Sequence, residues 1–224
     1  MRRLNWDSEF FDLEIAEILD ENNINYSECY KYDLIYYKSE KNFDITGFNL
    51  NYSENKVVFE KNNINPSHNK TKVISYQNDS LNTLYELAFE SGKYSRFLKD
   101  DLFGIENFKK LYREWIDNSI NKKFADDILI YKIDDEILGF VTYKIFNNYA
   151  QIGLIAVDNR HQGKGIGKEL IDGLELKLYQ NKIYTLKIPT QLENCNACNF
   201  YNKMGYKIIE NTPIKHYWKI NDTL

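Results

Sequence analysis

Apolar residues recur three and four positions apart in two stretches near the middle of the chain, and this spacing is typical of amphipathic helices. We expect the first helix to follow Ser80, whose hydroxyl suits an N-cap, and the second to run from about Ile105 to Ile120. Three strand-like segments come next, ADDILIYKI, EILGFVTYKIF and YAQIGLIAV. The last is the most apolar of the three and is expected inside a sheet.

The rest of the chain also mixes helix and strand patterns. Towards the C-terminus we expect a helix over about 165–179, the strand YTLKIPT, a helix over about 194–204, and two closing strands around Tyr206 and Tyr217. Towards the N-terminus, YDLIYYKS and KVVFEK have strand patterns. This order of elements predicts a layered domain of mixed α/β (α+β) class.

Charge is distributed unevenly along the chain. Residues 1–75 hold 13 of the 33 acidic side chains but only 9 of the 29 basic ones. We therefore place a domain boundary near Ser75. The prediction is a small N-terminal α/β domain, residues 1–75, followed by a second domain, residues 76–224.

Composition excludes several classes of protein. A chain of 224 residues with 43% hydrophobic and 15% aromatic residues can bury a core and is not expected to be disordered. A net charge of −4 without a dense basic stripe argues against binding nucleic acid. The apolar runs are too short to span a membrane, and the opening MRRLNWDSEFF does not lead into an apolar signal core. We expect a cytoplasmic protein with no nucleic-acid or membrane partner.

The three cysteines, Cys29, Cys195 and Cys198, are too few for a disulfide framework and are expected to be reduced. The spacing of Cys195 and Cys198 could hold zinc, but the sequence offers no second pair of ligands. We therefore expect no metal site and interpret this pair as packing within a helix.

A glycine-rich turn, Gln162–Gly167 (QGKGIG), follows the most apolar strand and leads into an expected helix. Consecutive backbone amides and a helix N-terminus then point at one spot, which favours an anion. The spacing fits neither the P-loop, in which Lys precedes Ser or Thr, nor the G-x-G-x-x-G dinucleotide motif. From the glycines alone, an anion-binding loop and an ordinary tight turn stay equally open.

Two motifs in this part of the chain point to one family. The first is Q-x-x-G-x-G, from Gln162 to Gly167. The second is N-x-x-A-x-x-F-Y-x-K-x-G-Y, formed by Asn194, Ala197, Phe200, Tyr201, Lys203, Gly205 and Tyr206. Together they resemble the GCN5-related N-acetyltransferases (GNAT), which bind acetyl-coenzyme A. The resemblance covers roughly residues 76–220 and implies the GNAT fold, a mixed and mostly antiparallel sheet flanked by helices.

Further segments narrow the resemblance: the opening LNWDSEFF from Leu4, then Ser95-Arg96-Phe97, Thr190-Gln191 and Tyr217-Trp218. They are similar to the TDP-fucosamine acetyltransferase branch, whose members carry an N-terminal domain before the acetyltransferase core. That branch acetylates the 4-amino group of a nucleotide-linked 4-amino-4,6-dideoxy sugar. The resemblance therefore implies an N-acetyltransferase with a small-molecule acceptor of this kind.

The resemblance also implies which residues bind the coenzyme. Pantetheine is expected along the apolar strand and beside Asn194, and the pyrophosphate on the amides of the glycine-rich turn. The expected binding residues are Leu154, Ile155, Ala156, Val157, Gln162, Gly163, Lys164, Gly165, Ile166, Gly167 and Asn194. A strand amide around Ile155 to Val157 is expected to stabilise the oxyanion. Tyr201 matches the family's general acid, which protonates the departing thiolate.

On the acceptor side we expect contacts from Trp6, Ser95, Arg96, Phe97 and His216. The guanidinium of Arg96 suits a diphosphate, although a salt bridge to a nearby Asp is an equal alternative. The general base stays open between Asp158, His216 and a water molecule.

Two other functions stay open. The acceptor could be a peptide, polyamine or antibiotic amine, for which an acidic cleft is more typical than one lined by Arg, Lys and aromatic residues. The chain could also be a coenzyme-binding module without turnover, although Tyr201 and Asn194 argue against this. A homodimer is a further expectation that comes only from the resemblance.

Overall fold

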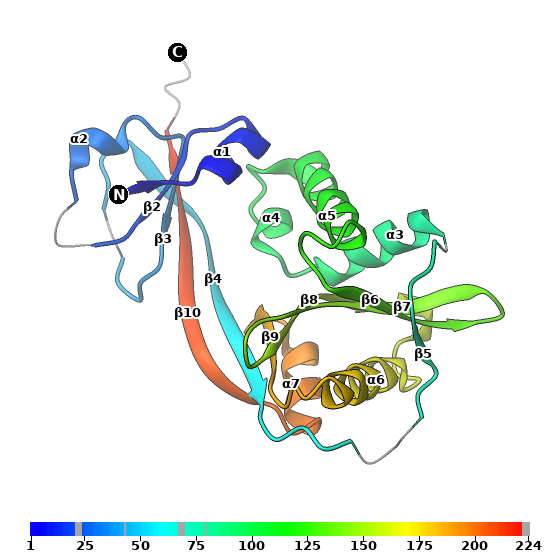
Figure 1. Cartoon of the computed structure of the whole chain (residues 1–224). Coiled ribbons are helices and arrows are strands. Elements are labelled where there is room, and N and C mark those ends of the chain that lie inside the picture. The colour runs from blue at the N-terminus through cyan, green and yellow to red at the C-terminus, as the bar shows by residue number, and fades with distance from the viewer. Residues whose placement is uncertain (21–23, 43, 67–69, 79, 221–224) are drawn as a thin grey trace.

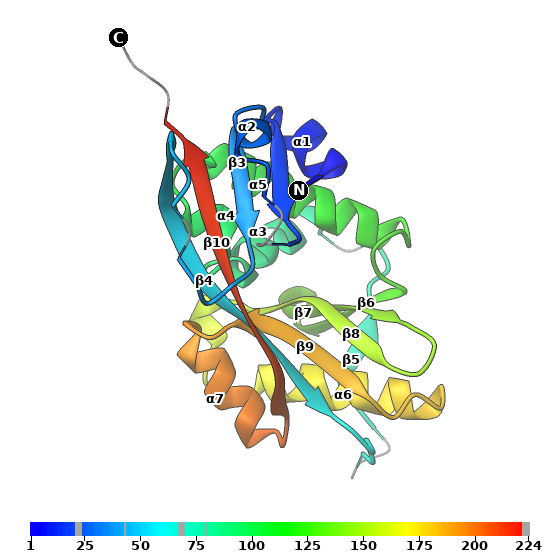
Figure 2. The same cartoon turned by 90° about the vertical axis from the view of Figure 1, so that its left-hand side faces the viewer.

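The computed structural model describes residues 1–20, 24–42, 44–66, 70–78 and 80–220. Its ten strands form one sheet in the order β1-β2-β3-β10-β4-β9-β8-β7-β6-β5 (Figure 1 and Figure 2). The strands are β1 (Arg2–Arg3), β2 (Ile15–Ile18), β3 (Leu34–Tyr37), β4 (Phe48–Lys61), β5 (Val73–Ser75), β6 (Asp127–Ile133), β7 (Glu136–Ile145), β8 (Ala150–Val157), β9 (Leu186–Gln191) and β10 (Lys207–Lys219). The helices are α1 (Asn5–Phe11), α2 (Tyr26–Cys29), α3 (Leu81–Ser91), α4 (Arg96–Lys99), α5 (Gly104–Ile120), the 3-10 turn η2 (Asn159–His161), α6 (Ile166–Gln180) and α7 (Cys195–Lys203).

The fold class agrees with the expectation. Only the β2–β3 and β8–β9 pairs are parallel among the described strands, and the other pairs are antiparallel. Figure 1 shows α3, α4 and α5 on one face of the sheet and α6 and α7 on the other. Because both faces of β6, β7 and β8 are covered, these strands are largely apolar instead of alternating.

Each face of the sheet carries its own apolar core. On one face, Leu170, Ile171 and Leu174 of α6 pack against residues such as Val141 and Ile188 of the sheet. The core on the opposite face joins residues of α1, α3 and α5 to β6, β7 and β8, and includes Phe11, Leu84, Leu111, Ile130 and Phe140. A third, smaller core lies under β2, β3 and α2.

Two long strands connect the ends of the molecule. β10 pairs along its whole length with β4, and its last residues also pair with β3 (Figure 1). β4 in turn pairs with β9 through Lys56–Lys61. The sheet therefore runs without a break across the boundary expected near Ser75, and β5, which ends at Ser75, forms its far edge beside β6. The sheet order shows no boundary at this position, and an N-terminal domain of residues 1–75 stays a prediction.

The helices of the second half begin and end close to where their patterns predict. Ser80 is the N-cap of α3, and its Oγ accepts a hydrogen bond from the amide of Thr83 at 3.4 Å. The two expected closing strands are instead one strand, β10. Its pairing with β4 continues through register shifts at Ile208/Glu210 and His216/Tyr217, which interrupt the residue pattern without ending the strand.

Candidate active site

The site begins where two parallel strands separate. β8 and β9 are paired at Ala150↔Leu186 and Gln151↔Lys187, and no later pair joins them among the described residues. Beyond this point β9 stays with β4, and β8 stays with β7. One edge of β8 is therefore open to a ligand that can pair with it as a further strand does.

A bulge in β8 sets which groups face this opening. Thr142 of β7 stands opposite both Gly153 and Leu154, and its Oγ1 accepts from the amide of Leu154 at 2.8 Å. The amide of Asp158 also points to β7, where it donates to the carbonyl of Leu138 at 2.9 Å. Because successive amides of a strand point to opposite sides, the amides of Ile155 and Val157 face the opening. A Cβ at residue 153 would lie 2.8 Å from Thr142 Oγ1, which explains the glycine.

The glycine-rich turn lies at the end of β8 and leads into α6. Gly163 and Gly165 have φ of 76° and 85°, in the left-handed region that favours glycine. Apart from the adjoining residues, no atom of the described chain lies within 4 Å of where a Cβ would stand on either glycine, so the space over the turn is open. Gly165 is also the N-cap of the 15-residue helix α6, whose first amides are free for an anion. The residues present therefore fit a pyrophosphate.

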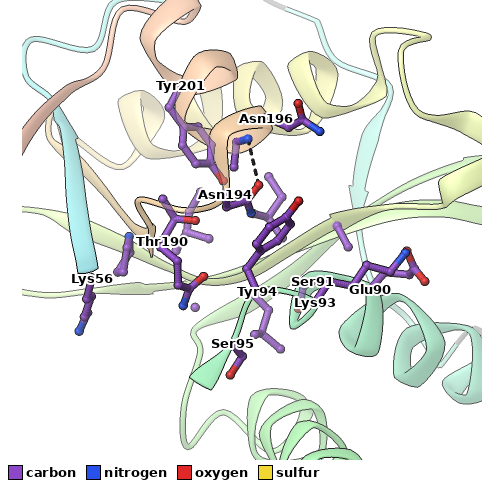
Figure 3. Close-up of a pocket in the computed structure, with 18 of the residues that line it drawn as sticks. Lys56, Glu90, Ser91, Lys93, Tyr94, Ser95, Thr190, Asn194, Asn196 and Tyr201 are labelled. Atoms are coloured by element: carbon purple, nitrogen blue, oxygen red, sulfur yellow. Dashed lines mark hydrogen bonds and ion pairs between the residues drawn. The ribbon is translucent and has the colours of Figure 1, made fainter. Parts of the chain in front are cut away.

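Asn194 and Tyr201 come from α7 and its cap. Asn194 Oδ1 accepts from the amide of Ala197 at 3.2 Å, which leaves the Nδ2 group as the donor facing the cleft (Figure 3). Tyr201 packs its ring 5.5 Å from that of Phe59 and is only 4% exposed. Burial, together with the nearby Cys198, raises the pKa of Tyr201, so its phenol stays protonated at neutral pH.

The open edge of β8, the turn and α7 line one cleft of about 1240 Å³. Its opposite wall, named the acceptor wall after the expectation above, comes from the N-terminal segment, from the α3–α4 connection and from one face of β4 and β10. Its residues include Trp6, Asp7, Lys93, Tyr94, Ser95, Glu54, Lys56, Glu210 and Thr212. Figure 3 shows Tyr201 and Asn196 on one side of this space and Tyr94 and Ser95 on the other. The residues of the expected set that line the cleft are Trp6, Ser95, Arg96, Phe97, Leu154, Ile155, Ala156, Val157, Gln162, Gly163, Gly165, Ile166, Gly167, Asn194 and Tyr201.

Two expected residues do not line the cleft. Lys164 is exposed, and it is the one residue of the Gln162–Gly167 turn that does not line the cleft. His216 is completely buried beneath the acceptor wall, and its Nδ1 lies 2.6 Å from Asp100 Oδ2. Burial lowers the pKa of His216 to about 4, although the bond to Asp100 opposes this. The structure therefore does not support the expectation that His216 contacts the acceptor or serves as its base.

Glu54 is the functional candidate that the sequence did not reveal. It lines the cleft from β4 and is 4% exposed, between Tyr52 and Lys56 on the same face of the strand. Tyr52 Oη donates to Glu54 Oε2 at 3.1 Å. Burial raises the pKa of Glu54, and the charge of Arg96 and the bond from Tyr52 only partly oppose the rise. The sequence signal, an acid in a strand of alternating pattern, does not show that this face borders the cleft.

Three cations lie around Glu54 at the acceptor wall: Lys38, Lys56 and Arg96. Lys38 pairs with Glu17 at 2.9 Å, whereas neither Lys56 nor Arg96 forms an ion pair with any described residue. Enclosure in the cleft, with the charges of Arg96 and Lys38, lowers the pKa of Lys56. The carboxylates of Asp7 and Glu54 lie close enough to feel the charge of Arg96, but none of the described carboxylates forms an ion pair with Arg96 or Lys56. Cations without such a direct partner are suited to an anionic ligand.

Ser95 and Phe97 present Arg96 to the cleft. The Oγ of Ser95 caps the short helix α4 by accepting from the amide of Phe97 at 3.2 Å. Phe97 is buried against Phe11 and Phe103, with ring centroids 5.5 Å and 5.3 Å away. Both residues therefore act mainly through the position of Arg96.

Metal-ligand clusters and membrane-spanning helices are two further features to consider. Within the described residues, no group of three or more His, Cys, Asp or Glu side chains could hold a metal ion. No described helix combines the length and the apolar character needed to cross a bilayer.

Comparison with known proteins places this site in context. The sequence model of the acetyltransferase (GNAT) family matches residues 81–206, more than half of the chain. The dTDP-fucosamine acetyltransferase of Escherichia coli O6:H1 is 28% identical over 174 residues, 77% of this chain and 71% of that protein. The spore coat polysaccharide biosynthesis protein SpsD of Bacillus subtilis is 27% identical over 133 residues, 59% of this chain but only 46% of that protein.

Other relatives share shorter regions or the fold alone. A streptothricin acetyltransferase of Escherichia coli is 31% identical over 77 residues, 34% of this chain and 44% of that protein. This chain thus spans less than half of that protein and of SpsD. A GCN5-related N-acetyltransferase of Sphaerobacter thermophilus has a TM-score of 0.53 at 11% identity, covering 85% of this chain and 62% of its own. An acetyltransferase of Colwellia psychrerythraea has a TM-score of 0.54 at 15% identity, covering 76% and 59%.

Proposed function

The chain is a member of the acetyltransferase (GNAT) family, and from this premise we propose that it moves an acetyl group from acetyl-coenzyme A to the amine of a nucleotide-linked amino sugar. The proposed acceptor is of the dTDP-4-amino-4,6-dideoxyhexose type. Acetyl-coenzyme A supplies the acetyl group as a reactive thioester. In the transfer a C–N bond to the sugar amine forms and the C–S bond of the thioester breaks.

The open edge of β8 and the glycine-rich turn are the proposed binding residues for this co-substrate. The amides of Ile155 and Val157 can pair with pantetheine, and one of them can stabilise the negative charge that develops on the thioester oxygen. The amides at the start of α6 suit the pyrophosphate. The Nδ2 group of Asn194 is the proposed donor to a pantetheine carbonyl.

Glu54 and Tyr201 are the proposed proton-transfer pair. Glu54 accepts a proton from the attacking amine, either directly or through one water molecule, and its raised pKa brings it closer to the working pH than an exposed carboxylate. Tyr201 donates its proton to the sulfur that leaves. The two residues then exchange the proton through solvent, which restores both for the next turnover.

The choice of acceptor rests on one observation: Lys56 and Arg96 face the cleft near Glu54, and neither forms an ion pair with a carboxylate in the described part of the chain. A polyamine has no anionic group for these side chains, whereas the diphosphate of a nucleotide sugar does. The similarity to a dTDP-fucosamine acetyltransferase over 77% of this chain supports the same choice.

The test is coenzyme A thiol release from acetyl-coenzyme A with a panel of acceptors: dTDP-4-amino-4,6-dideoxygalactose, a UDP-linked 4-amino sugar, spermidine and a short peptide. We expect turnover on the dTDP-linked sugar. Turnover on spermidine or the peptide alone would keep the acetyltransferase and overturn the acceptor. Coenzyme binding without turnover on any amine would instead favour a non-catalytic module.

A further inference from the structure

Arg96 lies at one end of a column formed by its guanidinium and two neighbouring rings under the acceptor wall, with the two rings tilted by 35° to each other. Its guanidinium carbon is 4.4 Å from the centroid of the Tyr36 ring. On the other side, the Tyr36 ring contacts that of His216, with centroids 4.7 Å apart. Tyr36 and His216 are direct neighbours across β3 and β10, so the two strands hold these rings in place.

Asp100 connects the base of this column to the helix that carries Arg96. Its buried carboxylate accepts from His216 Nδ1 at 2.6 Å, from Trp218 Nε1 at 2.8 Å and from Asn51 Nδ2 at 2.6 Å. Its own amide donates to the carbonyl of Arg96 at 3.0 Å. Asp100 thus contacts the backbone of Arg96 through its amide, and through its carboxylate it holds the His216 ring that packs against Tyr36.

The protonation of His216 suits this arrangement. The charged and titratable groups that face it are Asp100, Arg96, Tyr36 and Tyr52. A neutral imidazole donates Nδ1–H to Asp100 and places no second positive charge under Arg96. Its Nε2 is buried and, like the hydroxyl of Tyr36, has no hydrogen-bond partner among the described residues. The two rings therefore contribute stacking rather than polar contacts at these positions.

We propose that Tyr36 and His216, held by Asp100, are positioning residues that fix the guanidinium of Arg96 for an anionic group of the acceptor. This proposal rests on the proposed function in one respect: its kinetic test measures the acceptor KM and assumes that Arg96 binds the acceptor. Neither positioning residue lines the cleft. Their effect on the acceptor therefore passes through a residue that does line it, either Arg96 above Tyr36 or Glu54, which Tyr52 links to His216. The proposal is that this residue is Arg96.

A double-mutant cycle tests this dependence, with dTDP-4-amino-4,6-dideoxygalactose as the acceptor. We expect Tyr36→Leu to raise the acceptor KM by about 10-fold, the scale of one charged hydrogen bond, with little change in kcat. In the Arg96→Ala background the same substitution should change KM by less than about 2-fold. Equal effects in both backgrounds would overturn the proposal. Tyr36→Phe is the matched control, because it keeps the ring and removes only an unpartnered hydroxyl.

A second readout needs no acceptor. The Nε–Hε NMR signal of Arg96, assigned by its loss in Arg96→Lys, should show the upfield shift of a group that lies over an aromatic face. Tyr36→Phe should keep the shift and Tyr36→Leu should reduce it; an unchanged signal in Tyr36→Leu would overturn the stack. His216→Phe keeps a ring and His216→Asn keeps a donor to Asp100, so a loss of the shift in both would show that ring and hydrogen bond are needed together.

The two readouts separate the failure of this proposal from the failure of the proposed function. If Arg96→Ala leaves the acceptor KM unchanged, or if the dTDP-linked sugar is not a substrate, the proposed acceptor is wrong, and the NMR series still decides whether the stack holds Arg96. If Arg96→Ala raises KM and Tyr36→Leu does not, the proposed acceptor stands and positioning by the stack is wrong. Coenzyme affinity measured on each variant shows that it is folded.

Discussion

The two ends of the cleft are built from different parts of the chain. At the end proposed for the coenzyme, the groups that line the cleft are backbone amides of β8, the turn and the start of α6, which come from one stretch of about twenty residues. At the end proposed for the acceptor, they are side chains of residues that lie far apart in sequence, such as Trp6, Lys38, Glu54 and Arg96. A backbone site requires particular glycines and spacings, whereas a side-chain site can change its ligand by single substitutions. We therefore expect the first kind of site to be recognisable from a local sequence pattern, and the second to decide which substrate is bound.

The largest effect is expected from a substitution at the coenzyme end, which would abolish binding by the backbone amides. Gly165→Glu forces a side chain into the left-handed region at φ 85°, at a cost of about 1–2 kcal/mol, and places a negative charge over the free amides of α6. We expect calorimetry to detect no acetyl-coenzyme A binding. Gly165→Ala carries the strain without the charge and should weaken binding by only about 10-fold. Equal loss in both variants would show that conformation, and not the anion, explains the glycine.

Glu54→Gln tests the side-chain end. Loss of a general base is expected to lower kcat by about 10³-fold while coenzyme affinity stays the same. Burial raises the pKa of Glu54, so in the wild type kcat/KM should fall as the pH drops through that raised pKa and the carboxylate takes up a proton. The variant should lack this acidic limb.

Glu210→Gln is the matched control for Glu54→Gln. Glu210 also lines the cleft, but from an exposed position on β10, and its substitution should change kcat by less than about 3-fold. If Glu54→Gln kept the wild-type pH profile, a group other than Glu54 would take the proton from the amine.

Tyr201→Phe probes the point where the two ends meet. The ring keeps its packing against Phe59, and only the hydroxyl is lost. We expect kcat to fall by about 10²-fold with coenzyme affinity nearly unchanged. Tyr206→Phe is the matched control, because Tyr206 is equally buried but donates to Glu175 at 2.7 Å, outside the cleft. It should lower stability and leave kcat unchanged; full activity of Tyr201→Phe would instead remove Tyr201 from the mechanism.

The contrast between the two ends also explains what the sequence could predict. Local patterns predicted the helices and strands from Ser80 to Gly205. The glycine-rich turn, Asn194 and Tyr201, which were also found from local patterns, line the same cleft. In each case the relevant residues are close in sequence. Lys164 belongs to the same local pattern, yet it is the one residue of the turn outside the cleft lining, which the pattern did not predict.

Contacts between distant segments could not be predicted. The place of β10 between β3 and β4 decides that Glu54 and Lys56 border the cleft and that His216 is buried. Nothing in the pattern of either strand specifies this order. His216 was expected to contact the acceptor or to act as a base, but it is buried, and its partner Asp100 lies 116 positions away in the sequence, so its contact within the core could not be predicted.

The smallest effect is expected at the acceptor end, from a substitution of Trp6. Trp6 is 44% exposed in the cleft, and its ring stacks on that of Phe10 with centroids 4.9 Å apart and planes at 12°. Lys110 Nζ lies 4.5 Å from the centroid of Phe10, which fixes this pair against α5. A rigid aromatic face of this kind suits a nucleobase.

Trp6→Ala should raise the KM of the dTDP-linked amino sugar by about 10-fold, the scale of one lost base stack, whereas Trp6→Phe should change it little. The same amino sugar as its 1-phosphate has no base, so Trp6→Ala should not change its KM. An equal rise with both acceptors would show that Trp6 contacts the sugar. If the KM rose with neither acceptor, Trp6 would contribute to packing alone. The acceptor would then be bound only by Glu54 and the cations near it.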